Sequence, residues 1–239
     1  MTKKVYLGVG HGGKDPGAVA NGFKEKDLNL TVALTVRDEL ARHGVNSMMS
    51  RTNDADRELT ERIKECNDYD PDLALDIHNN AGGGDGAEVF YHYKGGTSKE
   101  LAQNILDSIV ANTEQNSRGI KVKLNSRGTD YFGFIRETYA PAVIVECAFL
   151  DNKVDLAAVD TLEEQTLMGE AIAKGILKTL NVNYIPKETN NDGIKIYRVQ
   201  CGAFRNRDYA DAYLEKLKAA GFTDAFITEA IMMNYSPKK

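Results

Sequence analysis

The chain has 239 residues, of which 42% are hydrophobic and 27% charged, so it can bury the core of an ordinary globular protein. Its net charge of −5 argues against a general nucleic-acid-binding protein, which would normally be basic. No apolar run is long enough to span a membrane. The N-terminus, MTKKVYLGVGHGG, is not a signal peptide, because its apolar run is short and broken by glycine. We therefore expect a chain that is made in the cytoplasm and has no membrane span.

Strand and helix patterns alternate along the first 180 residues. Strands are expected at residues 4–9, 45–50, 73–77, 87–93 and 142–146. Helices are expected at residues 26–43, from 59 to beyond 66, from 97 or 98 to beyond 109, and at 161–180. Asp27 is predicted to cap the first helix and Gly44 to end it. Segment 117–139 has a weaker pattern and is interpreted as a long loop with a strand near Phe132–Arg136. Such alternation predicts an α/β fold with a mostly parallel twisted sheet flanked by helices.

The C-terminal part is predicted to be a separate, smaller unit. Residues 182–193 are polar, contain a proline and lack periodicity, which is typical of a linker between a domain at 1–181 and a unit at 194–239. Within that unit we expect a strand at 194–200, a helix at 208–220 and a strand at 225–228, forming a small α+β (βαβ) unit. A unit of this size rarely holds a stable core alone.

Three side chains capable of binding a metal are predicted to meet at one edge of the sheet. His11 lies in a glycine-rich loop after the first strand, Glu25 stands where the first helix should begin, and His78 follows a buried strand. In sheets of this kind, sites form outside the carboxyl ends of the strands. Two histidines and a glutamate are a ligand set for catalytic zinc, with water in the fourth position. Glu146 ends the strand expected at 142–146, where it is either a salt-bridged residue or a general base beside the metal.

Each of these residues also has an ordinary explanation. Taken singly, His11 could be a loop histidine, Glu25 an acid favoured by the helix dipole, and His78 a core histidine. Gly8, Gly10 and Gly13 match the GxGxxG pattern of dinucleotide sites, but such a site needs a helix to open at the third glycine. Here the helix begins only near Lys26, so the nucleotide interpretation is disfavoured and the metal site is favoured.

Several blocks together closely resemble the zinc-dependent N-acetylmuramoyl-L-alanine amidases of the amidase type 3 family. These blocks are VGHGGKDPGA with FKEKDLNL, the SRT that includes Arg51 and Thr52, DIHNNA, and PAVIVECAFLDN. The resemblance spans residues 4–180 and implies zinc on His11, Glu25 and His78, with Glu146 catalytic. Asn80, in the DIHNNA block, is expected to line the substrate site.

The C-terminal sequence YRVQCGAFRNRDYADAYLEKLKAAGF resembles the sporulation-related repeat (SPOR), a module that binds peptidoglycan. The module usually has two βαβ-like halves, and this chain shows one. The unit is therefore a truncated module, a shorter relative, or a half that pairs with a second chain in a homodimer through residues 194–239.

The resemblance implies hydrolysis of the amide between N-acetylmuramic acid and L-alanine in bacterial peptidoglycan, by a phage endolysin or an autolysin. Without a signal peptide, such an enzyme reaches the cell wall after a membrane-permeabilising partner acts or a mother cell lyses. Two alternatives remain open at this stage. One is a zinc peptidase that cuts within the stem peptide, and the other is a wall-binding protein without catalytic activity.

Overall fold

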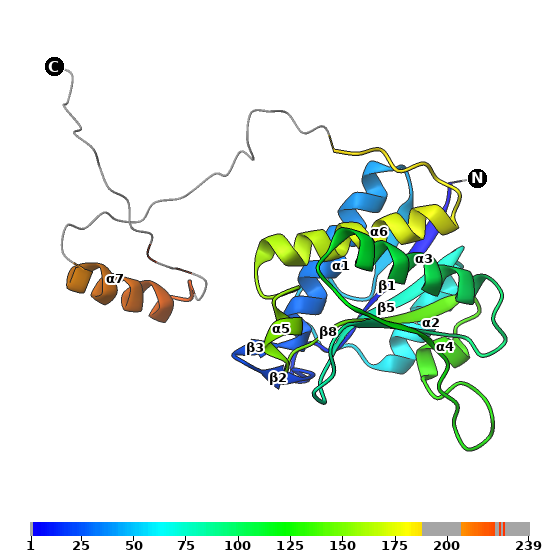
Figure 1. Ribbon diagram of the computed structural model, residues 1–239, viewed down its shortest axis with the longest axis horizontal. Coiled ribbons are helices and arrows are strands. Elements are labelled where there is room, and N and C mark those ends of the chain that lie inside the picture. Colours follow the sequence, from blue (N-terminus) through cyan, green and yellow to red (C-terminus); the bar gives the residue numbers. More distant parts are fainter. Residues whose placement is uncertain (1, 188–206, 223–224, 226, 228–239) are drawn as a thin grey trace. The chain divides into compact units, whose positions relative to one another are not determined.

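The computed structural model describes residues 2–187 and 207–222, together with Ala225 and Ile227. The chain divides into two compact units, Met1–Pro186 and Lys187–Lys239. Figure 1 shows the elements of both units along the chain. Among the described residues, no helix combines the length and the apolar character required to cross a bilayer.

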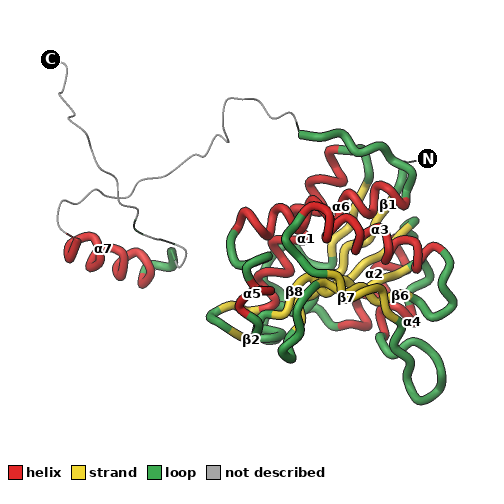
Figure 2. The backbone as a smooth tube through the Cα atoms, viewed as in Figure 1, coloured by secondary structure: helices red, strands yellow, loops and turns green. Residues whose placement is uncertain are grey.

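The first unit consists of short strands alternating with helices (Figure 2). Its strands are β1 (Lys4–Val9), β2 (Val19–Ala20), β3 (Phe23–Lys24), β4 (Asn46–Met49), β5 (Leu73–Asn80), β6 (Ala87–Tyr91), β7 (Ser117–Lys121) and β8 (Ala142–Phe149). Its helices are α1 (Glu25–Arg42), α2 (Leu59–Tyr69), α3 (Thr97–Asn112), α4 (Gly133–Glu137), α5 (Lys153–Leu156) and α6 (Leu162–Thr179).

Six of these strands form one mixed, mostly parallel sheet in the order β4-β1-β5-β8-β6-β7. Strands β4, β1, β5 and β8 run parallel to one another, while β6 runs antiparallel to β8 and parallel to β7. The remaining two strands, β2 and β3, form a small antiparallel pair just before α1. The α/β fold with a flanked, mostly parallel sheet is therefore confirmed.

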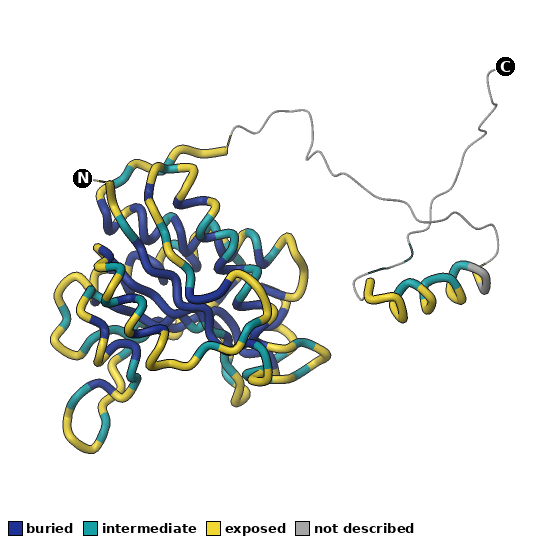
Figure 3. Tube along the Cα trace, turned by 180° about the vertical axis from the view of Figure 1, so that it is seen from behind, coloured by how far each residue is buried: buried dark blue, intermediate teal, exposed yellow. Residues whose placement is uncertain are grey.

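The sheet lies between two helical layers of unequal size, and its strands are buried (Figure 3). Alternate residues of each strand face opposite sides. Side chains such as Leu75 and Val145 pack against α1, α3 and α6 in the larger core. Tyr6, Ala74 and Ala142 face the other way, toward α2 and α4. Because this smaller layer covers mainly the first residues of the strands, it leaves room on this face for polar side chains at the strands' carboxyl ends.

Two local predictions were wrong. Residues 117–139 begin with strand β7, and the predicted strand near Phe132–Arg136 is the short helix α4. The guanidinium of Arg136 donates to the carbonyl oxygens of Asp130 and Tyr131, so this helix is fixed by contacts that a strand pattern does not reveal.

The predicted cap of the first helix was also wrong. Helix α1 begins at Glu25, so Asp27 lies inside its first turn. The N–H groups of Glu25 and Lys26 donate to the carbonyl oxygens of Ala18 and Pro16 instead. Backbone of the preceding loop therefore replaces the expected side-chain cap. Gly44 ends this helix as predicted, with a φ of 71°.

Close packing of α6 against α3 gives a stability prediction. A Cβ at Gly175 would lie 2.5 Å from Ile105 Cα and 2.7 Å from its N, which are backbone atoms that cannot swing aside. Gly175→Ala is therefore expected to destabilise the protein by about 1–2 kcal/mol, because the overpacking strain exceeds the gain in helix propensity. Urea unfolding should show this loss, whereas the exposed Lys178→Ala in the same helix should change stability by less than about 0.5 kcal/mol. An unchanged midpoint for Gly175→Ala would contradict the packing described.

In the second unit the structure describes helix α7 (Arg207–Ala219), close to the helix expected at 208–220. The predicted strand at 194–200 lies outside the described residues, as do two of the four residues of that at 225–228. The α+β (βαβ) arrangement of the unit thus stays a prediction.

At the end of the first unit, Tyr184 stacks on His43 with ring centroids 5.1 Å apart, and the Ile185 N–H donates to His43 Nε2. These contacts extend the first unit to Pro186.

Candidate metal centre and active site

His11, Glu25 and His78 come together at the carboxyl ends of β1 and β5. His11 follows β1 with a φ of 58°, Glu25 is the first residue of α1, and His78 lies within β5. One ligand atom from each residue can be chosen so that all lie within 4.8 Å of one another. The structure therefore brings together the three residues that the sequence predicted as a metal site.

Glu25 is the centre of this cluster. Its Oε2 lies 3.1 Å from His11 Nε2 and its Oε1 lies 2.9 Å from His78 Nδ1. Backbone N–H groups of Ala18 and Asn79 donate to the same carboxylate. Burial would raise the pKa of Glu25, but the hydrogen bonds with both histidines hold that pKa well below its usual range. The carboxylate is therefore held ionised, as a metal ligand must be.

The same contacts act on the histidines. The hydrogen bond with Glu25 raises the pKa of His11. Burial opposes the charge on His78, yet Asp76 and Glu25 raise its pKa well above the ordinary value. Both rings thus face a concentration of negative charge, which a divalent cation would neutralise.

The cluster has the donor set of a catalytic zinc site. Two imidazole nitrogens and one carboxylate oxygen are typical zinc ligands, and three protein ligands leave a fourth position for water or substrate. The backbone is also shaped around these side chains. A Cβ at Gly17, whose φ is 65°, would lie 2.5 Å from Glu25 Oε2 and 2.6 Å from His11 Cδ2. The residues present therefore fit zinc.

Gly10 provides the space for the third ligand. A Cβ at this position would lie 2.3 Å from Cε1 and 2.5 Å from Nδ1 of the His78 ring. Gly10→Ala is therefore expected to displace the ring and to weaken zinc binding by at least about tenfold, as a misplaced ligand does. Zinc titration against a competing chelator measures the effect. As a control, Gly22→Ala lies in the turn between β2 and β3, where a Cβ meets nothing within 4 Å. Its φ of 86° gives this variant backbone strain without a clash against a ligand. Equal affinities for Gly10→Ala and the parent chain would show that His78 does not need this space.

Glu146 stands beside the cluster on the neighbouring strand. In the parallel pairing of β5 and β8, it is the register partner of His78, so the two side chains project from the same face. Its Oε2 is buried and has no hydrogen-bond partner among the described residues. Burial raises the pKa of Glu146 to about 7, and nearby carboxylates add to this shift while His78 opposes it. The salt bridge that would have explained Glu146 structurally is not formed within the described part of the chain.

Asn80 lies two residues beyond His78 on the same strand. Its Nδ2 donates to Glu88 Oε1 at 3.3 Å, and its Oδ1 accepts from the Ala81 N–H. Glu88 is itself the register partner of Glu146 and forms ion pairs with Arg118 and Lys121. The predicted substrate-site residue therefore lies at the end of β5, beside a charged group that the sequence did not suggest.

Residues that hold the ligands were not predicted. Asp15 contacts His11, while Asp76 contacts His78 and forms a buried ion pair with Arg62. Asn29 donates to Glu25 Oε1 at 3.3 Å. One sequence signal was available for Asp76, because residues two apart on a strand share a face and Asp76 precedes His78 by two.

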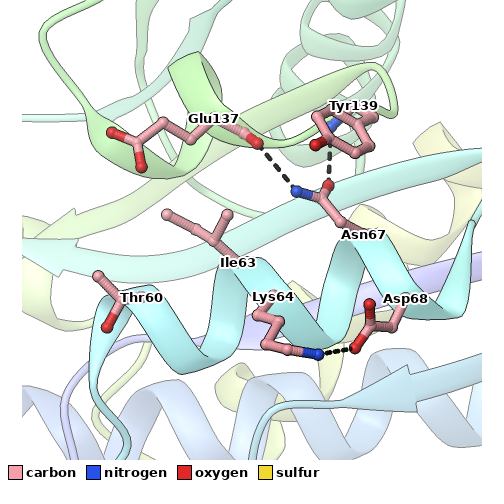
Figure 4. Close-up of a pocket in the computed structure, with 7 residues that line it drawn as sticks. All are labelled: Thr60, Ile63, Lys64, Asn67, Asp68, Glu137 and Tyr139. Carbon is pink, nitrogen blue, oxygen red and sulfur yellow. Dashed lines mark hydrogen bonds and ion pairs between the residues drawn. The ribbon is translucent and has the colours of Figure 1, made fainter.

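A hollow on the α2 and α4 side of the sheet contains none of these ligands. Asn67 bridges its two walls by donating to the Glu137 carbonyl oxygen and accepting from the Tyr139 N–H (Figure 4). Its lining residues are Thr60, Ile63, Lys64, Asn67, Asp68, Glu137 and Tyr139. The hollow is thus separate from the predicted site.

Comparison with known proteins agrees with the site chemistry. The family model of N-acetylmuramoyl-L-alanine amidase matches residues 5–178, and the SPOR domain model matches residues 194–231. The chain is 32% identical to the sporulation-specific N-acetylmuramoyl-L-alanine amidase of Bacillus subtilis over 92% of this chain and 82% of that relative. It is 35% identical to the endolysin of Bacillus phage SPP1, over 76% of this chain and 68% of the endolysin.

Solved structures show the same similarity. The catalytic domain of CwlV, an N-acetylmuramoyl-L-alanine amidase from Bacillus (Paenibacillus) polymyxa, superposes with a TM-score of 0.69 at 30% identity. The match covers 76% of this chain and 100% of that domain. Cwp6 from Clostridium difficile superposes with a TM-score of 0.74 at 38% identity, over 75% of this chain and 30% of Cwp6. The chain therefore belongs to the amidase type 3 family of zinc-dependent N-acetylmuramoyl-L-alanine amidases, which hydrolyse peptidoglycan, and it carries a C-terminal SPOR domain.

Proposed function

We propose that this chain cleaves the amide between the lactyl group of N-acetylmuramic acid and L-alanine, with Glu146 as the catalytic base. Zinc held by His11, Glu25 and His78 would polarise the scissile carbonyl and lower the pKa of water. The observation that carries the proposal is the position of Glu146, whose unpartnered Oε2 lies on the strand next to His78 and on the same face.

Glu146 moves the proton that the reaction requires. Its carboxylate takes a proton from the attacking water while the new C–O bond forms at the carbonyl carbon. As the C–N bond breaks, the same group gives that proton to the leaving nitrogen of L-alanine, so the glutamate returns to its ionised form. A pKa raised to about 7 by burial suits a group that must both accept and donate a proton near neutral pH.

Asn80 is proposed to bind substrate at the rim of this site. Its side-chain amide has one N–H donor directed at Glu88, and an amide of this kind can donate a second hydrogen bond. Its position on β5, two residues beyond His78, supports this role. Asn80→Ala should therefore raise KM more than it lowers kcat.

Product analysis tests the bond that is cut. A soluble muramyl-peptide fragment is incubated with the zinc-loaded chain, and the products are identified by mass spectrometry. The proposal predicts an intact stem peptide with a free L-alanine amino terminus and a sugar with a free lactyl carboxylate. Shortened stem peptides would instead identify a zinc peptidase. If the substrate stays intact, the remaining interpretation is a wall-binding protein without catalytic activity.

The C-terminal SPOR domain is proposed to hold the enzyme on the insoluble wall and so raise the local concentration of bonds at the site. The first unit buries its own core, so a chain ending at Lys187 can be compared with the full chain. We expect the shorter chain to sediment less with peptidoglycan sacculi while it cleaves soluble fragments at the same rate. Equal sedimentation would show that residues beyond 187 do not anchor the enzyme.

A homodimer through residues 194–239 is proposed as one way to complete a module of which the sequence shows one half. Light scattering of the full chain distinguishes the states, because a monomer has a mass of 26.3 kDa and a dimer twice that. A monomer at concentrations that still bind sacculi would contradict the pairing.

Delivery to the wall is proposed to follow loss of the membrane barrier, through a membrane-permeabilising partner or through lysis of a mother cell. The relatives include both a sporulation-specific amidase and a phage endolysin, so both routes are kept in the proposal. The protein, when made inside cells, should then degrade the wall only after the membrane has been permeabilised. Cells whose membrane barrier is intact should keep their walls.

A further inference from the structure

Each histidine of the metal cluster has its second ring nitrogen held by an aspartate. His11 turns Nε2 toward Glu25, and its Nδ1 lies 2.7 Å from Asp15 Oδ2. His78 turns Nδ1 toward Glu25, and its Nε2 lies 3.3 Å from Asp76 Oδ2. The two rings therefore face Glu25 through opposite nitrogens. In each ring the other nitrogen contacts an aspartate carboxylate.

The two aspartates differ in their surroundings. The side chain of Asp15 is 64% exposed, so it can move and exchange its contact for water. The side chain of Asp76 is 3% exposed and forms an ion pair with Arg62 of α2, whose side chain is 7% exposed. Asp76 is thus fixed between an arginine on one side and the His78 ring on the other.

A glycine on the neighbouring strand leaves space for the ion pair between Asp76 and Arg62. A Cβ at Gly8 on β1 would lie 2.6 Å from Asp76 Oδ1 and 2.9 Å from Arg62 Nη2. Gly8 is the register partner of Asp76 in the sheet. The first two glycines of the GxGxxG pattern are therefore explained without a nucleotide, because Gly8 makes room for the ion pair and Gly10 for the His78 ring.

We propose that Asp76 and Arg62 are positioning residues that fix His78 with its Nδ1 lone pair directed at zinc. Asp76 accepts a hydrogen bond from Nε2–H, which sets both the tautomer and the orientation of the ring. Carboxylates that hold ligand histidines in this way orient the ring and increase its basicity, and their loss usually weakens metal binding 10–100-fold. Arg62 in turn keeps the carboxylate ionised and in place.

A purely structural ion pair is the alternative. Buried ion pairs are weak stabilisers, because desolvation of the two charges offsets most of their attraction. A structural pair would affect folding and leave the zinc affinity of the folded protein unchanged. The two interpretations thus differ in a quantity that can be measured directly and does not depend on which bond the enzyme cuts.

The test compares zinc affinity in full-length variants by competition with a chromogenic chelator. Asp76→Ala combined with Arg62→Met removes both charges together, so neither is left buried and unpaired. We expect this double variant to bind zinc 10–100-fold more weakly than the parent chain. Asp76→Asn keeps the shape and an acceptor oxygen, so an intermediate loss is expected.

Asp130→Ala is the matched control. Asp130 is 2% exposed and lies 3.2 Å from Nε2 of His92, so it holds a histidine outside the metal cluster. Its loss should leave zinc affinity within about twofold of the parent chain. Parent-like affinity in a folded double variant, or an equal loss in Asp130→Ala, would overturn the proposal. Nitrogen NMR of the zinc-loaded parent chain gives a test that needs no variant, because His78 must then carry its proton on Nε2. A His78 ring that binds zinc through Nε2 and carries its proton on Nδ1 would also overturn the proposal.

Discussion

Replacing Glu146 with glutamine is expected to lower kcat for the muramoyl-L-alanine bond by about 10²–10⁴-fold, the usual contribution of general acid–base catalysis. Glutamine has the same shape but cannot take the proton from water. Zinc content should stay the same, because Glu146 is not among the three clustered ligands. Folding should also be preserved, since burial already disfavours the charge that the substitution removes. Initial rates on a soluble fragment measure the change.

Two comparisons make this result specific. Glu146→Asp keeps the carboxylate but shortens the side chain, so it should retain more activity than the glutamine variant. Metal analysis and circular dichroism confirm that zinc and fold are intact. A fully active Glu146→Gln enzyme would show that another group moves the proton.

Replacing His78 with alanine is expected to abolish both zinc binding and activity. This change removes one of three protein ligands, together with the contact between its ring and the Glu25 carboxylate. Metal catalysis contributes several kcal/mol to lowering the barrier, so a loss of at least about 10³-fold in kcat/KM is expected. Zinc analysis after dialysis and rate measurements with added zinc are the readouts.

The contrast between the two variants separates their roles. Glu146→Gln should be inactive with zinc bound, whereas His78→Ala should be inactive because zinc is lost. An active, metal-free His78→Ala enzyme would contradict the zinc assignment. A zinc-bound but inactive His78→Ala enzyme would show that the other ligands suffice for binding.

The sequence predicted the site well because its residues follow strong strand patterns. His11, His78 and Glu146 lie at the carboxyl ends of buried strands, and in a parallel sheet such ends meet at one edge. Glu25 was placed by the start of the first helix. These four positions depend on topology, which hydrophobic periodicity indicates reliably.

Positions set by tertiary contacts could not be predicted. Helix α4 is held by Arg136 and two buried side chains, so its five residues carry no clear periodic pattern. Helix α1 is capped by backbone carbonyls of the preceding loop, a contact that leaves no residue signature. Arg62 lies on α2, 14 residues before its partner Asp76, and nothing in their spacing links them.

The most direct test of the account is the labelling of new amino termini on peptidoglycan sacculi, with and without a zinc chelator. The account predicts that L-alanine amino termini accumulate, that the chelator prevents their release, and that added zinc restores it. New termini on any other residue, or release of L-alanine termini that the chelator does not affect, would contradict it.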